Sequence, residues 1–397
     1  MKRRTTTKKK IMTVLLFCIV STLLVVFLSK NAFNLSNEKS KNKKRLIDTK
    51  ALIKTPVIKE SEVSLIMVGD CLIHGAIYDD AKTSSGNYDF RKMFTNIKPI
   101  IEKYDLAFYN QESILGGKEL GLSSYPRFNS PKEVGESLTE IGFNLVSLAN
   151  NHTLDSGTKA IYSSLEFWKN KEDVIAAGSY ASEEERLTPK IMEKNGISYA
   201  LLAYTTTTNG LIRPKNEPYL LTIFDKEEVK KDVENLRDKV DILLVSMHWG
   251  EEYTHEPTKE QKEIAYFLAS LGVDIVIGHH PHVVQPVEFI DNTMVIYSLG
   301  NFISSQYGVD KLTGVMVSVK IKKLSVDKIS NITLEEPTAE FVYTDSKITS
   351  YRHDYKLYQY DMLTDEILKD YRKHYDRHVE IITSLNKDIK VLPLQKH

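Results

Sequence analysis

Seven short apolar runs, each followed at once by polar residues, define the architecture of this chain. The first run, 64–70, ends in Gly-Asp, and the third, 143–149, leads into Asn-Asn-His. Continuous apolar runs of this length are typical of strands that are buried on both faces and end in a loop. The seven predicted strands lie within residues 64–70, 105–110, 143–149, 197–203, 241–246, 273–277 and 293–297.

Helical patterns separate several of these runs. Residues 158–170 and 258–271 carry apolar side chains at helical spacing. Strands that alternate with helices predict an α/β fold. After the seventh run, residues 315–321 alternate like an antiparallel strand, and residues 364–385 have the spacing of a further helix.

Composition excludes some classes of protein. The chain has 397 residues, with 53 Lys and Arg balanced by 53 Asp and Glu, so its net charge gives no sign of nucleic-acid binding. Hydrophobic residues make up 42% of the chain, as in an ordinary globular protein. The only cysteines, Cys18 and Cys71, are too few for a disulfide framework or a cysteine-rich zinc site.

The N-terminus has the pattern of a membrane segment. Basic residues crowd positions 1–10, and the nineteen residues from Ile11 to Ser29 carry no charge. Nineteen helical residues span about 28 Å, close to the roughly 30 Å hydrocarbon core of a bilayer. The run lacks a clear small-residue cleavage site. We predict an uncleaved anchor, and the alternatives are a cleaved signal peptide and a buried core helix.

These features divide the chain into five segments. The basic segment 1–10 is expected to stay in the cytoplasm, although the basic residues between Lys39 and Arg45 oppose that orientation. The main domain of this single-pass membrane protein would then lie outside the cell. The predicted segments are 1–10 cytoplasmic, 11–29 transmembrane, 30–62 tether, 63–345 globular domain and 346–397 C-terminal helical extension.

Polar residues that suit a metal site follow the predicted strands. In open α/β sheets, ligands bind at the carboxyl ends of the strands. Carboxylate, amide and imidazole groups together suit one or two ions of zinc, manganese or iron. The candidate ligands are Asp70, Glu112, Asn151, His248, His280 and His282.

Each candidate also has an ordinary structural explanation. Asp70 can cap a loop, Glu112 can complete a turn, and His248 can be a hydrogen-bonded structural histidine. The His280-Pro-His282 pair is more specific, because residues two apart can direct both imidazoles at one point.

A series of short motifs runs in order from about residue 64 to 303. It comprises residues 68–70, 110–112, 148–152 with Asp155 and Gly157, 247–253, 278–285 and 297–302. These motifs resemble those of the CapA family, also called the poly-γ-glutamate synthesis PgsA family.

That family in turn resembles calcineurin-like metallophosphoesterases, which implies a four-layer α/β/β/α sandwich and a role for each motif. Asp70 would be the ligand after the first strand, Glu112 the bridge between two metals, and Asn151 a further ligand. The remaining imidazole ligands would be His248, His280 and His282. His152 would act as general acid or transition-state stabiliser, with Asp155 as the second catalytic candidate.

Other positions concern the substrate and the departures from the pattern. Leu72 stands where phosphoesterases usually have the histidine of Asp-x-His, and Glu112 replaces the usual aspartate. Arg127 can clamp a carboxylate or phosphate, with a surface ion pair as the alternative. We group Arg127, Asn110 and Asn301 as candidate substrate-binding residues.

Three hypotheses about function remain open. The first is a metal-dependent hydrolase-like enzyme that acts on a capsule-polymer intermediate. The second is a non-catalytic subunit that handles an anionic polymer, poly-γ-glutamate, beside membrane capsule-synthesis subunits. The third is a general metallophosphoesterase. The resemblance implies the membrane and the polymer as partners, and the balanced charge predicts no nucleic-acid partner.

Overall fold

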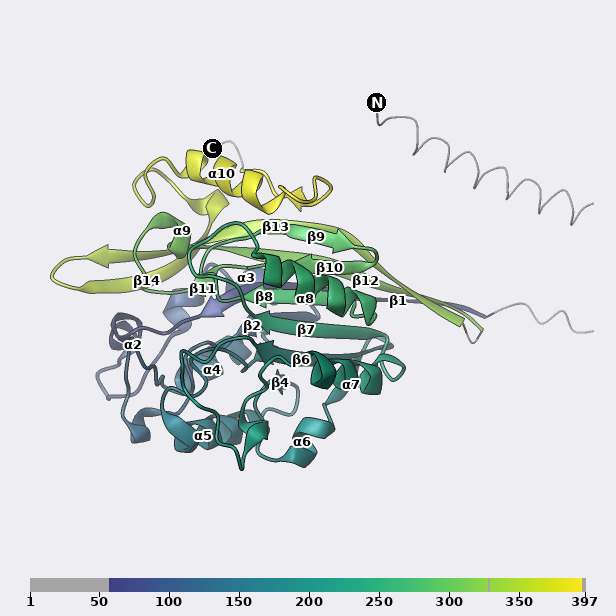
Figure 1. Ribbon diagram of the computed structural model, residues 1–397. Helices are drawn as coiled ribbons and strands as arrows, with labels where there is room; N and C mark the ends of the chain where they lie inside the picture. The colour runs from purple at the N-terminus through teal and green to yellow at the C-terminus, as the bar shows by residue number, and fades with distance from the viewer. Residues whose placement is uncertain (1–56, 328, 395–397) are drawn as a thin grey trace, which may run out of the picture. The chain divides into compact units, whose positions relative to one another are not determined.

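Two β-sheets organise the residues that the computed structural model describes, which are 57–327 and 329–394 (Figure 1). From Val57 onward these residues form one compact unit. The predicted anchor 11–29 and most of the predicted tether lie outside the described residues. Within the described ranges, no helix has the length and apolar character needed to span a bilayer.

The first sheet has nine strands. Their order is β14-β13-β12-β1-β2-β3-β4, with β11 beside β1 and β15 beside β13. β1 to β4 are parallel, whereas β12, β13 and β14 join the other side of β1 as antiparallel strands. The bounds are β1 Ile58–Cys71, β2 Leu106–Asn110, β3 Leu145–Ser147, β4 Ile175–Ala177, β11 Asn301–Ile303, β12 Thr313–Val326, β13 Ile329–Ile348, β14 Arg352–Gln359 and β15 Lys390–Val391.

The second sheet has six strands, in the order β5-β6-β7-β8-β10-β9. β6, β7, β8 and β10 are parallel, so their carboxyl ends lie at one edge of the sheet. The bounds are β5 Ile191–Lys194, β6 Ile197–Thr205, β7 Ile242–His248, β8 Ile275–His279, β9 Val287–Ile290 and β10 Thr293–Ile296.

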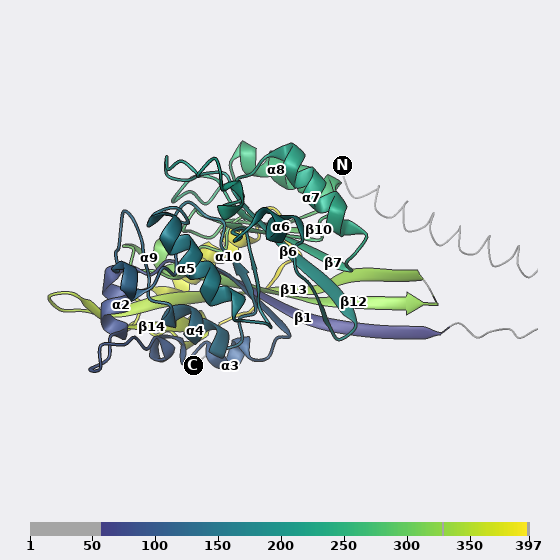
Figure 2. The same cartoon turned by 90° about the horizontal axis from the view of Figure 1, so that it is seen from below.

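Helices cover the outer faces of both sheets. Helices α2 to α5 pack on the first sheet, and α7 and α8 pack on the second, so the domain has four layers (Figure 2). The α-helices are α2 Gly75–Ala81, α3 Lys98–Ile101, α4 Glu133–Glu140, α5 Gly157–Lys169, α6 Glu183–Leu187, α7 Lys226–Arg237, α8 Lys259–Ser270, α9 Val309–Leu312 and α10 Tyr371–Ile382. The short 3-10 helices are η1 Arg91–Phe94, η2 Lys118–Leu120, η3 Pro218–Leu220 and η4 Tyr360–Met362.

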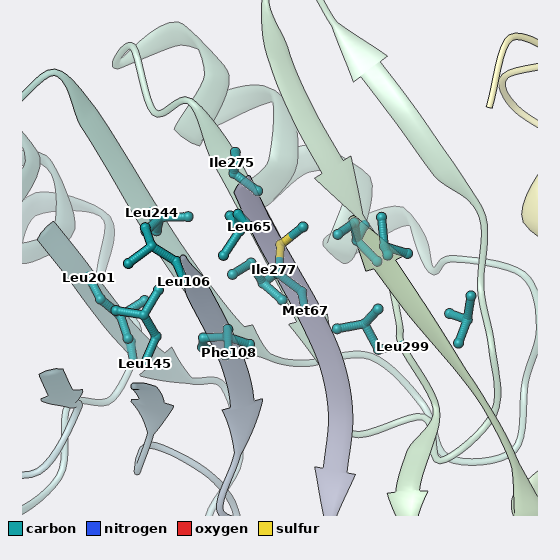
Figure 3. Packing of buried hydrophobic residues seen from close by; sticks show 14 of the residues in the cluster. Leu65, Met67, Leu106, Phe108, Leu145, Leu201, Leu244, Ile275, Ile277 and Leu299 are labelled. Atoms are coloured by element: carbon teal, nitrogen blue, oxygen red, sulfur yellow. The ribbon is translucent and has the colours of Figure 1, made fainter. Parts of the chain in front are cut away.

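The main core lies between the two sheets (Figure 3). Leu65 and Met67 of β1 face this core, whereas Ile66 of the same strand faces the helices on the outer side. Leu244 of β7 and Ile277 of β8 contribute from the second sheet, and both are fully buried. Burial on both faces explains the uninterrupted apolar runs, and each such side chain stabilises the fold by about 1.5–3 kcal/mol.

The predicted mixed α/β fold is confirmed, and each of the seven apolar runs contains a strand. Two boundaries differ from the prediction. The strand β1 begins at Ile58, inside the predicted tether, because its first half pairs with the end of β12. The segment 346–397 is not purely helical. It contains α10, but β14 and β15 in the same segment extend the first sheet.

A close approach of backbones brings two site segments together. A Cβ atom on Gly69 would lie 1.8 Å from the carbonyl oxygen of Gly300. The amide of Asp70 donates to that same oxygen at 2.9 Å. Only glycine fits before Asp70, and this contact holds Asp70 beside Asn301 at the edge of the sheet.

Candidate metal centre

The six predicted ligands meet at the edge where strands of both sheets end. Asp70 lies near the end of β1, and His248 is the last residue of β7. The other four lie on the loops that follow β2, β3 and β8. All six side chains are buried, with exposed fractions from 0% to 7%. Parallel strands therefore bring groups as far apart in sequence as Asp70 and His282 to one place.

Glu112 lies at the centre of this arrangement. One group of potential ligands is Glu112, His248 and His280, and a second is Asp70, Glu112 and His282. Within each group the ligand atoms lie within 4.8 Å of one another. Glu112 belongs to both groups, so a single carboxylate lies between two possible cation positions.

The Glu112 carboxylate has no hydrogen-bond partner among the described residues, although both of its oxygens are buried. Its Oε1 lies 3.8 Å from His248 Nε2 and 3.7 Å from His282 Nε2, which is too long for a hydrogen bond. Ligands bound to one cation at about 2.0–2.2 Å lie roughly 3–4 Å from each other. These separations fit cations on either side of Glu112, whereas a bare buried carboxylate is costly.

The first position gains a further ligand from the loop after β3. Asn151 Oδ1 lies 3.0 Å from His248 Nε2. The rings of His248 and His280 lie 4.7 Å apart between centroids. The Asn151 amide oxygen therefore lies next to the group of Glu112, His248 and His280, and together they form a donor set that suits zinc, manganese or iron.

The second position is supported by two amides. Asn110 Nδ2 donates to Asp70 Oδ1 at 2.8 Å. His282 Nδ1 lies 3.0 Å from Asn301 Oδ1, and because an amide oxygen only accepts, Nδ1 carries the proton. That hydrogen bond leaves His282 Nε2 free to act as a ligand on the Glu112 side. Asn110 and Asn301 are fully buried beside candidate ligands, and their contact with substrate stays a prediction.

His279 is a residue of the site that the sequence analysis did not select. Its Nδ1 lies 3.2 Å from Asp70 Oδ1, and its ring stacks on Phe108. The side chain is fully buried without a hydrogen bond among the described residues. The sequence signal for a role of His279 was the presence of three histidines within four residues. That pattern does not show in which direction the His279 side chain points at the end of β8.

The loop after β8 holds its histidines in a strained backbone. His280 has a φ of 97° and His282 a φ of 58°, both in the left-handed region that favours glycine. Each such residue costs about 1–3 kcal/mol, and such conformations cluster at functional sites. Both imidazoles of the His-Pro-His motif belong to ligand groups that contain Glu112.

Burial sets the protonation of the ligands. Burial and the neighbouring His280 lower the pKa of His248, and burial lowers the pKa of His280 to about 4. Burial and the nearby Asp70 carboxylate raise the pKa of Glu112 well above its usual range. The imidazoles are therefore neutral at physiological pH, as cation binding requires, and the charge of Glu112 needs a neutralising partner.

His152 and Asp155 form a pair beside the candidate centre. His152 Nδ1 lies 2.7 Å from Asp155 Oδ2, which also accepts from the backbone amide of Phe128 at 2.7 Å. The ring of His152 packs edge-on against Phe128. Since Asp155 engages Nδ1, Nε2 is the atom through which His152 can exchange a proton.

A cavity of about 290 Å³ adjoins these groups. His152, Asp155 and His282 line one part of it, and Arg127 and Tyr253 line another. Of the three predicted substrate-binding residues, Arg127 is the one that lies on the cavity wall. The structure thus brings together two groups of candidate metal ligands, a hydrogen-bonded His–Asp pair and a cavity.

Comparison with known proteins finds a family and relatives that are all described as capsule or PGA synthesis proteins. A model of the family described as "Bacterial capsule synthesis protein PGA_cap" matches residues 64–306. The PGA biosynthesis protein CapA of Bacillus subtilis (strain 168) is 29% identical over 307 residues, covering 74% of this chain and 78% of that protein. The capsule biosynthesis protein CapA of Bacillus anthracis is 27% identical over 262 residues, covering 62% of this chain and 61% of that protein.

Solved structures give more distant similarities. A putative 5'-nucleotidase from Staphylococcus aureus has a TM-score of 0.46 and 18% identity, covering 81% of this chain and 59% of that one. The NAD nucleotidase of Haemophilus influenzae has a TM-score of 0.43 and 14% identity, covering 85% of this chain and 65% of that one.

Proposed function

The chain belongs to the PGA_cap family of bacterial capsule synthesis proteins, and from that premise we propose a metal-dependent, hydrolase-like role in the synthesis or export of a poly-γ-glutamate capsule. The observation that carries the proposal is the position of Glu112 in two ligand groups at once. A carboxylate shared in this way is the arrangement that two-cation hydrolytic sites need.

The residues divide into those that hold cations and those that move a proton. Glu112, with Asn151, His248 and His280 on one side and Asp70 and His282 on the other, would hold divalent cations. When bound, these cations would polarise a carbonyl or phosphoryl group of the substrate and activate water. His152 exchanges a proton through Nε2, and Asp155 keeps the ring in the required tautomer.

Metal loading of the full-length chain tests this proposal. After removal of metal with a chelator and titration with Zn²⁺ or Mn²⁺, we expect about two ions per chain by elemental analysis and a higher Tm. A ligand present at 100 times its Kd stabilises the folded state by about 2.7 kcal/mol. The control is His353→Ala, because His353 belongs to neither ligand group and lies far from Glu112 in sequence. This variant should bind the same number of ions per chain as the wild type. No retained cation would contradict the proposal.

We also propose that residues 11–29 anchor the protein in the cell membrane and that the main domain lies outside the cell. The uncharged run and the basic residues before it support this orientation. There the domain would meet the anionic polymer and other membrane capsule-synthesis subunits. We expect protease added to intact cells to remove the domain while the anchor stays in the membrane fraction. Full protection of the domain until the cells are lysed would contradict this location.

A further inference from the structure

The cavity beside the candidate centre has one permanent cation on its wall. Of the described residues that line it, Arg127 is the only arginine, and no lysine is among them. The Arg127 side chain is exposed and makes no hydrogen bond or ion pair with the described residues. The alternative that the sequence left open, a surface ion pair, is therefore not formed. An unpaired guanidinium on a cavity wall is free to bind an anion in a bidentate manner.

The loop that carries Arg127 is fixed to the proton-transfer pair. The neighbouring amide of Phe128 donates to Asp155 Oδ2, and the Phe128 carbonyl accepts from Ser156 Oγ at 2.9 Å. The Phe128 ring packs against His152. The backbone amide of Arg127 also donates to the Ser124 carbonyl at 3.2 Å. The backbone of this loop is already held in place, so it does not have to be ordered when an anion binds to Arg127.

Two exposed aromatic side chains line the same cavity. Tyr125 is 76% exposed and Tyr253 is 50% exposed, and both line the wall. Tyr253 has a φ of 65°; its ring stacks with the His282 ring at 6.0 Å, and the Lys311 ammonium lies 4.5 Å from its centroid. Lys311 thus adds a second positive charge next to Tyr253. Exposed aromatic rings beside a guanidinium favour a ligand that joins an anionic group to an apolar or planar segment.

We propose that Arg127 determines substrate specificity by binding a second anionic group, a carboxylate or a phosphate, of a substrate whose reacting group lies at Glu112 and His152. The inference rests on the proposed function, since it places the reacting group at that site. It predicts that the substrate carries at least two anionic groups joined by a segment that packs on Tyr125 and Tyr253. A substrate with one anionic group would gain nothing from Arg127.

Binding measurements on the full-length, metal-loaded chain test this role. We expect Arg127→Gln to raise the Kd for γ-glutamate oligomers or for short polyphosphate by about 10-fold or more, while the Kd for inorganic phosphate stays unchanged. The Kd values of Arg127→Lys should lie between those of the wild type and Arg127→Gln, because lysine keeps the charge but loses the planar guanidinium group. An effect on the oligomer alone identifies carboxylate as the second group, and an effect on polyphosphate alone identifies phosphate.

Lys169→Gln is the matched control, since it removes one exposed positive charge on α5 that does not line this cavity. It should leave every Kd unchanged. The inference is overturned if Arg127→Gln changes neither Kd, or if both variants weaken polyanion binding equally, which would indicate general charge attraction. Metal content is measured on the same preparations. Absence of cations in the wild type would contradict the proposed metal-dependent function, whereas unchanged Kd values in metal-loaded Arg127→Gln would contradict only the role of Arg127.

Discussion

Replacing Glu112 by glutamine is expected to leave the metal-free protein at least as stable as the wild type, and to remove most of the rise in Tm that divalent cations produce. The Glu112 oxygens are buried without hydrogen bonds, and burial and Asp70 raise the pKa of the carboxyl. Charging Glu112 in the empty site therefore costs stability. Glutamine removes that charge but also removes the carboxylate shared by both cation positions.

The pH dependence has a definite sign. A carboxyl whose pKa is raised on folding lowers the free energy of unfolding as pH rises above its unfolded value of about 4.3. The metal-free wild type should therefore lose stability relative to Glu112→Gln from about pH 4.3 upward, until the raised folded pKa is passed. Chemical denaturation in the presence of a chelator, at several pH values, measures this difference.

A matched control separates the shared ligand from other acids near the cavity. Glu252 lines the cavity but belongs to neither ligand group, so Glu252→Gln should keep the full cation-dependent shift in Tm. Two results would oppose the assignment of Glu112. One is a full cation-dependent shift in Glu112→Gln, and the other is a large loss of stability in that variant without metal.

The second large effect is expected at His152. If the site hydrolyses an aryl phosphate or a polymer intermediate, His152→Ala should lower the rate about 10²- to 10⁴-fold, which is the usual contribution of a general acid or base. Metal content should not change, because His152 belongs to neither ligand group. Steady-state rates at saturating cation, with metal analysis of each preparation, measure both quantities.

His74→Ala is the control for His152, since His74 lines the same cavity but has no carboxylate partner. His74→Ala should lower the hydrolysis rate by less than about 10-fold. In cells, loss of capsule polymer in the His152→Ala strain would agree with catalysis. Full polymer production with normal metal content would instead favour the alternative in which the protein handles the polymer without reacting with it.

Much of the fold follows from the sequence because its central strands are buried on both faces. Runs such as 64–70 and 241–246 have no polar position to interrupt them, which separates them clearly from helices and loops. The first half of β1 gives no such signal, because Ile58–Glu62 forms an exposed ribbon with a partner more than 250 residues away. β14 was missed for a related reason, since only Tyr355 and Leu357 of its residues are buried.

The candidate site was predictable to the level of residue type and strand position. A carboxylate or imidazole that ends a parallel strand must lie at the common edge, so the convergence of Asp70 and His248 followed from topology. The direction in which a side chain points did not follow from topology. Asn110 and Asn301 point to candidate ligands and not into the cavity, and the contact of His279 with Asp70 depends on how β8 ends.

Anomalous diffraction from crystals of the Mn²⁺- or Zn²⁺-loaded protein would locate the cations. We expect two peaks on opposite sides of the Glu112 carboxylate, about 3.5–4 Å apart. One peak should lie within bonding distance of His248, and the other within bonding distance of His282. Peaks remote from Glu112, or no peak in this region at saturating cation, would contradict it.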